Sequence, residues 1–239
     1  MSEPRPGVEL LWGAPRTPAR GPRPGLSLER IVGEAVAIAD AAGVAGLTMP
    51  GLARRLDAGT MSLYRYIPGK DDLISLMIET ATGDAPRLDV SDGWRPALTH
   101  WAHATRTVLL AHPWMLDVVT SPRVMGPREL GWLEEGLRAL SVLALPPMRR
   151  FDLALLVNGY VRGVALEQVH GEAVAAQGPF FTPELLTEHG READFPLLME
   201  VMESFPFDAP AGDGEDARFA FGLERLLDGI ETHFGGAAV

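Results

Sequence analysis

Apolar residues recur at spacings of three and four along most of the chain, which is the period of one face of an α-helix. The first such stretch starts after Ser27, a suitable N-cap, and stops at Gly43. Helices are also expected at residues 48–56, 60–66 and from Lys70 onward, and then at 93–112, 113–120, 127–145, 147–177, 182–204 and 215–234. No run of alternating apolar and polar residues is long enough for a sheet, so the pattern predicts an all-α protein.

The first 26 residues break this pattern, because they contain six prolines and four arginines. Such a segment buries too little apolar surface to offset the cost of ordering it, so we expect a mobile arm. We therefore divide the chain into an arm at residues 1–26, a small helical domain at 27–83 and a larger helical domain at 84–239.

Composition narrows the classes of protein that remain. The 239 residues include no cysteine, which excludes disulfides and cysteine-based metal sites. There is no apolar stretch long enough to span a membrane and no secretory leader, so we expect a cytoplasmic location. The formal net charge is -11, which argues against a broad nucleic-acid coat. Residues 48–70 reverse this balance, since they carry Arg54, Arg55, Arg65 and Lys70 against Asp57 alone.

The basic region coincides with two short predicted helices, 48–56 and 60–66, separated by a three-residue break. This spacing is typical of a helix-turn-helix, in which the second helix presents its N-terminal residues to bases in the major groove. Small residues allow close approach there, and tyrosines and a lysine offer donors to phosphates. The expected DNA-binding residues are Thr48, Gly59, Thr60, Met61, Ser62, Tyr64, Arg65, Tyr66 and Lys70.

The stretch GTMSLYRYIPGKDDL, with LTMPGLARRL before it, resembles the recognition region of the tetracycline-repressor (TetR) family. The resemblance covers residues 26–77 and continues more loosely through 94–168 and 221–231. It implies that Thr48, Tyr64 and Lys70 contact phosphates and that residues 60–62 read bases. Tyr66 stands where the tetracycline repressors have histidine. Pro50 replaces a guanine-reading arginine, so a different operator sequence is expected.

The resemblance further implies a homodimer, a small-molecule effector and double-stranded operator DNA as partners. Dimerisation is expected through the helices at 148–171 and 215–234, whose apolar stripes need burial. Aromatic residues and polar residues within apolar stripes are candidates for ligand contact, although internal packing explains them equally well. These candidates are His103, Trp114, Met125, Trp132, Phe151, Asn158, Arg162 and Phe181.

Neither catalytic nor metal-binding motifs occur in the sequence: G-x-S-x-G, a P-loop, G-x-G-x-x-G and H-E-x-x-H are all missing. We therefore expect no enzyme activity, no cofactor and no metal. The hypothesis is a ligand-responsive transcriptional regulator, acting as a repressor. The alternatives are an all-helical enzyme or carrier with an incidental helix-turn-helix, and an activator of the same fold.

Overall fold

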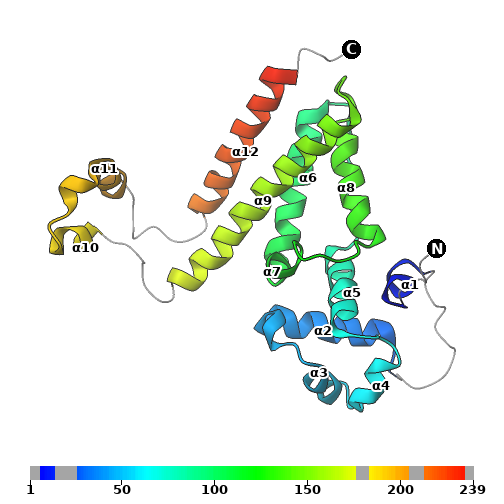
Figure 1. The fold of residues 1–239 in the computed structure, drawn as a ribbon. Helices are drawn as coiled ribbons and strands as arrows, with labels where there is room; N and C mark the ends of the chain where they lie inside the picture. Colours follow the sequence, from blue (N-terminus) through cyan, green and yellow to red (C-terminus); the bar gives the residue numbers. More distant parts are fainter. Residues whose placement is uncertain (1–5, 14–25, 176–182, 205–212, 235–239) are drawn as a thin grey trace.

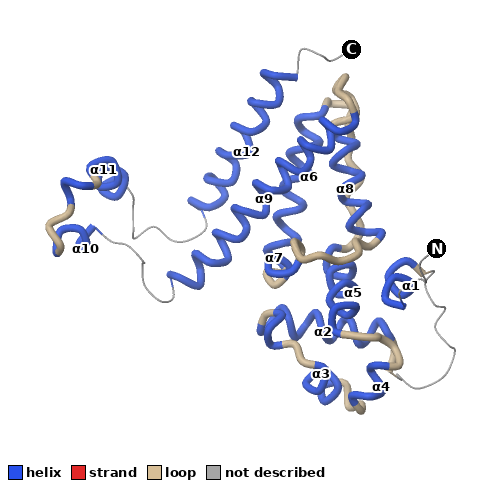
Figure 2. The backbone as a smooth tube through the Cα atoms, viewed as in Figure 1, coloured by secondary structure: helices blue, strands red, loops and turns tan. Residues whose placement is uncertain are grey.

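The computed structural model describes residues 6–13, 26–175, 183–204 and 213–234. All regular elements in these ranges are helices (Figures 1 and 2), so the prediction of an all-α fold is confirmed. None of the described helices has the length and apolar character needed to cross a membrane. The helices form two packed groups, α2–α5 and α6–α9 with α12, which we call the head and the body.

The head is a compact set of short helices (Figure 1, blue to cyan). Its elements are α2 (Leu28–Ala42), η1 (Val44–Gly46), α3 (Met49–Arg55), α4 (Thr60–Tyr64) and α5 (Lys70–Thr82). Ile31, Leu52, Leu63, Ile67 and Leu73 are all fully buried at its centre. Each comes from a different part of the segment, so burial of these five side chains fixes the relative positions of all four α-helices.

Side-chain caps set where two of these helices begin. The Ser27 hydroxyl accepts a hydrogen bond from the Arg30 amide at 3.2 Å and starts α2. The Thr48 hydroxyl accepts one from the Gly51 amide at 3.1 Å and starts α3. These bonds satisfy amides that have no partner within the helix, as the sequence pattern predicted.

The body is built from long helices that run beside one another (Figure 1). Its elements are α6 (Trp94–Ala111), α7 (Met115–Val118), α8 (Pro127–Ala139), α9 (Pro147–Ala175) and α12 (Asp213–Phe234). Helix α6 packs against α8 and α9, and α9 packs against α12. Trp101 is 1% exposed in this core, and its indole Nε1 donates a hydrogen bond to the Trp132 carbonyl at 2.8 Å.

The predicted helix at 182–204 is wrong, because three short elements replace it. These are α10 (Pro183–Glu188), η2 (Glu192–Asp194) and α11 (Pro196–Ser204). Gly190 adopts a positive φ of 62°, a conformation that favours glycine and ends α10. Pro196 then starts a new helix where its missing amide costs nothing. The turn residues therefore outweigh the apolar spacing of three and four.

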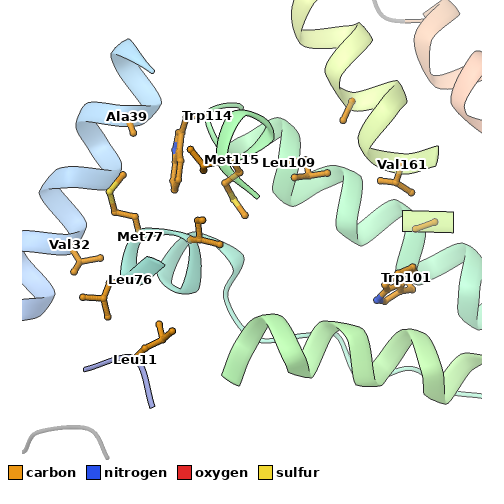
Figure 3. Close-up of a cluster of buried hydrophobic side chains, with 14 of the residues drawn as sticks. Leu11, Val32, Ala39, Leu76, Met77, Trp101, Leu109, Trp114, Met115 and Val161 are labelled. Carbon is orange, nitrogen blue, oxygen red and sulfur yellow. The ribbon is translucent and has the colours of Figure 1, made fainter. Parts of the chain in front are cut away.

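Apolar contacts join the head to the body (Figure 3). Ala39 of α2 and Met77 of α5 face Trp114 and Met115, and all four side chains are buried. Polar contacts surround this cluster. The Asp40 carboxylate accepts a hydrogen bond from Trp114 Nε1 at 2.7 Å and lies 2.8 Å from His112 Nδ1. Helix α2 is thus attached directly to the C-terminal end of α6 and to α7.

A second attachment links α5 to α8. The buried Glu79 carboxylate accepts a hydrogen bond from the Arg128 amide at 2.8 Å, in the first turn of α8. The Trp132 indole Nε1 donates to the Gly83 carbonyl at 3.2 Å, just past the end of α5. The C-terminal end of α5 is therefore held by the body, while its N-terminal end carries Lys70 in the head.

The predicted mobile arm differs from the structure over part of its length. Residues Pro6–Trp12 form helix α1, which packs against α5 (Figure 1). Leu10 and Leu11 pack against the core, and Leu11 is only 7% exposed. The prediction missed this helix because it was based on the proline and arginine content of the arm as a whole. Residues 1–5 and 14–25 of the predicted arm lie outside the described ranges.

Candidate DNA-binding surface

The turn between α3 and α4 sets the angle of the candidate recognition helix. Asp57 has a positive φ of 52°, a value at which aspartate is tolerated better than bulkier residues. The next residue closes the turn, since the Ala58 amide donates to the Ala53 carbonyl at 2.9 Å. Leu63 and Ile67 are fully buried and hold α4 and its C-terminal extension against the head. These contacts leave the opposite side of α4 facing solvent.

That solvent-facing side carries three of the predicted DNA-binding residues, Met61, Tyr64 and Arg65. Met61 is 77% exposed and Tyr64 is 44% exposed, both high values for large side chains. Arg65 is exposed as well, and its Nη2 donates a hydrogen bond to the Ser62 hydroxyl at 3.2 Å. This bond draws the guanidinium back along α4 towards its N-terminal half.

The phosphate-contact candidates lie around this surface. Lys70 is exposed at the first position of α5, and Thr48 is exposed at the start of α3. The Thr48 oxygen accepts the capping hydrogen bond, so its hydroxyl proton remains available to a phosphate. Pro50, also exposed, has neither an amide proton nor a side-chain donor, so the structure gives it no base-reading group.

Tyr66 is placed differently from Tyr64. It is only partly exposed, and its hydroxyl donates a hydrogen bond to the Leu26 carbonyl at 2.8 Å. A phosphate contact would need the same proton. The hydroxyl therefore attaches the residue preceding the α2 cap to the end of the recognition helix, a role that the sequence pattern did not predict.

The charges of this surface are largely uncompensated. Arg55 forms an ion pair with Glu34 of α2. Within the described ranges, no acidic side chain forms an ion pair with Arg54, Arg65 or Lys70. These three cations stay free to attract phosphates at the end of an otherwise acidic molecule.

The ligand-contact candidates do not come together in one site. His103 is exposed on α6 and packs edge-on against Phe219, with ring centroids 5.0 Å apart. Trp114 lies in the apolar cluster between head and body. Trp132 lies elsewhere, where its indole is hydrogen-bonded to the Gly83 carbonyl at the attachment of α5 to α8. Met125 lies in the loop before α8, and its carbonyl accepts from the Trp12 indole.

The remaining candidates lie on or beyond α9. Phe151, Asn158 and Arg162 are spread along this helix and are all partly exposed. Phe181 lies outside the described residues. The prediction of a shared ligand site therefore remains a prediction for these residues, and the described structure does not assemble it.

A hollow of about 190 Å³ lies where the head, α7 and α9 meet. Of the ligand candidates, Trp114 alone lines it. Its walls also include Asp40 and Gly43 of the head, and Pro113, Leu116, Asp117, Leu166, Val169 and His170 of the body. Sequence spacing could not indicate this site, because three segments distant along the chain form it.

Comparison with known proteins supports the arrangement described above. A family model for the tetracyclin repressor-like C-terminal domain matches residues 85–234. The transcriptional repressor DrrR1 of Streptomyces coeruleorubidus is 36% identical, over 94% of this chain and 84% of its own length. An HTH-type transcriptional regulator of Saccharopolyspora erythraea is 33% identical, over 98% and 95%.

Solved structures agree on the fold. A possible TetR family transcriptional regulator from Streptomyces coelicolor superposes with a TM-score of 0.68 at 26% identity, covering 85% of this chain and 98% of its own. The Streptomyces coelicolor protein ActR, in complex with (S)-DNPA, also gives 0.68, at 24% identity over 89% and 99%. These similarities confirm the resemblance found in the sequence. The chain belongs to the TetR family of DNA-binding transcriptional regulators.

Proposed function

We propose that this protein is a homodimeric repressor that binds operator DNA through α4 and is released from it by a small molecule. The observation that carries the proposal is the exposed side of α4, where Met61, Tyr64 and Arg65 face solvent beside cations without acidic partners among the described residues. One side of this short helix is packed firmly against the head. Large side chains exposed on its other side are expected where a binding partner covers them.

The proposed contacts follow from this geometry. Tyr64, Lys70 and the Thr48 hydroxyl hold phosphates and set the register of the protein on the duplex. Met61 and the small residues Gly59, Thr60 and Ser62 allow α4 to enter the major groove. Arg65 reads a guanine, because a guanidinium can donate both hydrogen bonds that guanine O6 and N7 accept. Its bond to Ser62 supports this role by orienting the group.

Dimerisation is proposed through α9 and α12. Leu155, Leu156 and Leu166 of α9 are exposed, as is Phe221 of α12 at 66%. The two helices pack together, so their outer sides can form one surface. Two copies would bury these apolar side chains in a four-helix arrangement and place two α4 helices at successive major grooves, about 34–36 Å apart.

Ligand release is proposed by analogy with structures of the same fold. ActR has been solved with actinorhodin, and TetR of Acinetobacter baumannii with minocycline. In this chain, a ligand in the hollow at Trp114 would touch both Asp40 of the head and α9 of the body. It would weaken DNA binding to the extent that it binds the DNA-incompetent arrangement more tightly. The protein would then act in the cytoplasm, without enzymatic turnover of the ligand.

The test is an unbiased selection of genomic fragments retained by the purified protein, followed by fluorescence anisotropy on the enriched sequence. Wild-type protein should retain a palindromic site, and Tyr64→Ala should weaken binding without lowering the unfolding temperature. Arg149→Ala, an exposed arginine of the body, is the matched control and should leave affinity unchanged. Retention of no specific sequence, or equal binding by Tyr64→Ala, would refute the assignment of the interface.

A further inference from the structure

Helix α1 is firmly docked although it precedes the head by a long stretch of chain. Leu11 is 7% exposed and belongs to the same apolar core as the helices of the head. Figure 3 places its side chain beside Leu76 of α5, with Val32 of α2 close by. On the opposite side of the short helix, Glu9 is exposed to solvent. One buried side chain and one exposed side chain thus define the docked orientation.

This helix contacts both the head and the body. Towards the head, Gly7 lies directly against Asp72 in the first turn of α5, where a Cβ on the glycine would clash with the carboxylate. Towards the body, the Trp12 indole Nε1 donates to the Met125 carbonyl at 3.1 Å. Leu11 also reaches Gly126, whose Cβ, if present, would lie 3.2 Å from Leu11 Cδ1.

The two ends of α1 therefore lie on different parts of the molecule, one at the start of α5 and the other just before α8. Asp72 belongs to the DNA-facing end of α5, whereas Met125 and Gly126 belong to the loop that leads into α8. The other described links, Glu79 to Arg128 and Asp40 to Trp114, lie at the C-terminal end of α5 and at α2. Gly126 also packs against the Glu79 carboxylate, so α1 lies beside the attachment of α5 to α8 and extends it towards the N-terminal end of α5.

We propose that α1 is a strap between head and body, and that Leu11 and Trp12 are positioning residues for DNA binding. While α1 is docked, it restricts the angle at which the head leaves the body. Because α1 is part of the same chain, its docking is intramolecular, with an effective concentration on the order of millimolar. A modest contact surface is then enough to keep the strap closed.

The strap also links DNA binding to ligand-induced release, and this part of the inference rests on the proposed function. A ligand that turns α5 relative to α8 would act against the contacts that α1 makes with both, so the strap would oppose release from DNA. Breaking the strap should therefore loosen the head in the absence of any ligand. Breaking the strap should also lower the affinity for operator DNA by about 5-fold or more. This is the lower end of the typical coupling between two sites in one protein.

The absence of cysteine makes a direct distance measurement possible. Spin labels are attached at Ala45→Cys in the head and Ala144→Cys at the far end of the body, both exposed positions. Labelled chains are mixed with excess unlabelled chains so that only the distance within one chain is recorded by pulsed electron paramagnetic resonance. The comparison is between the parent protein, Leu11→Asp, which places a charge at a buried site, and the matched control Glu9→Ala.

The parent and Glu9→Ala should give the same narrow distance distribution, and Leu11→Asp should give a broader one. A chain that lacks residues 1–12 serves as the second variant, should Leu11→Asp fail to fold, and should broaden the distribution equally. A distribution as narrow as the parent's in a folded variant would overturn the strap. If the parent retained no operator DNA, the proposed function would fail, but this distance measurement would still decide the strap.

Discussion

The head and the body of this protein relate to their sequences in opposite ways. Each short helix of the head begins at a recognisable cap or glycine, and the exposed side chains of α4 have proposed roles in DNA binding. The body consists of long helices whose apolar stripes are shared among an internal core, a proposed dimer interface and a hollow at the joint. Local sequence signals therefore predict the helices of the head well. The role of each apolar residue in the body depends instead on which helices pack against one another.

The largest expected effect tests the cooperative core of the body. Trp101→Ala removes a ring that is 1% exposed, together with the indole hydrogen bond to the Trp132 carbonyl. We expect the free energy of unfolding to fall by about 3–5 kcal/mol, measured by urea denaturation. Val142→Ala, at a position 43% exposed in the same domain, should change it by less than about 0.5 kcal/mol. A loss below about 1 kcal/mol for Trp101→Ala would mean that the core adapts to the cavity.

The next effect lies in the head and concerns recognition of sequence. Arg65→Ala should cost about 1–3 kcal/mol at one guanine of each half-site and little when that base is changed. Anisotropy on paired operators, with and without the guanine, measures the difference. Arg54→Ala, which removes another exposed arginine, should weaken both operators alike. An equal loss on both operators for Arg65→Ala would identify a phosphate contact instead.

Lys70→Ala should have a smaller effect that does not depend on sequence. The lysine is exposed at the start of α5 and is proposed to neutralise one phosphate. Because the proposed dimer carries this lysine in both half-sites, its removal should reduce the slope of log affinity against log salt concentration by about 1.8, which is about 0.9 for each half-site. A salt titration of operator binding gives this slope directly. If the slope is unchanged, the amine does not neutralise a phosphate in the complex.

The smallest effect returns to the body and its surface. Arg95 on α6 bonds to Glu224, Asp228 and Glu231 of α12, and its guanidinium lowers the pKa of Asp228 below the ordinary value of 3.8. A group whose pKa is lowered by folding stabilises the folded state above its unfolded pKa, and this contribution disappears as the pH falls through the folded pKa. The wild type should therefore lose stability as the pH falls below about 4.

Asp228→Asn isolates that contribution. The variant should unfold at a lower temperature than the wild type at neutral pH, and the difference should shrink as the pH falls below about 4, because the wild-type carboxylate also becomes neutral. Thermal unfolding at a series of pH values measures it. Asp92→Asn, at an exposed position before α6, is the control. A difference that persists in acid would point to side-chain packing as its cause.

The sequence predicted the head almost residue by residue. Ser27 and Thr48 were expected to cap helices and do so in the structure. The expected DNA-binding residues did not include Leu63 and Ile67, and the structure buries both of them fully. These predictions succeed because capping and the helical period depend on residues only a few positions apart. Tyr66 shows the limit of such reasoning, since its partner Leu26 is 40 residues away.

The body shows where local reasoning fails. Gly190 and Pro196 divide a segment whose apolar spacing alone indicates one helix. Trp114 and Trp132 look equivalent in sequence, yet one packs at the head–body cluster and the other bonds to the end of α5. Their positions depend on contacts between segments far apart in the chain. Helix α1 likewise becomes visible only once the surface that receives Leu11 is assembled.

The position of Lys70 has a practical consequence for labelling chemistry. It is the only lysine in the chain, and it lies exposed at the first residue of α5. A reagent selective for lysine side chains therefore has a single target, located on the proposed DNA-facing end of the molecule. A fluorophore attached there needs no engineered residue, and protection of this amine from modification gives a chemical footprint of the occupied head.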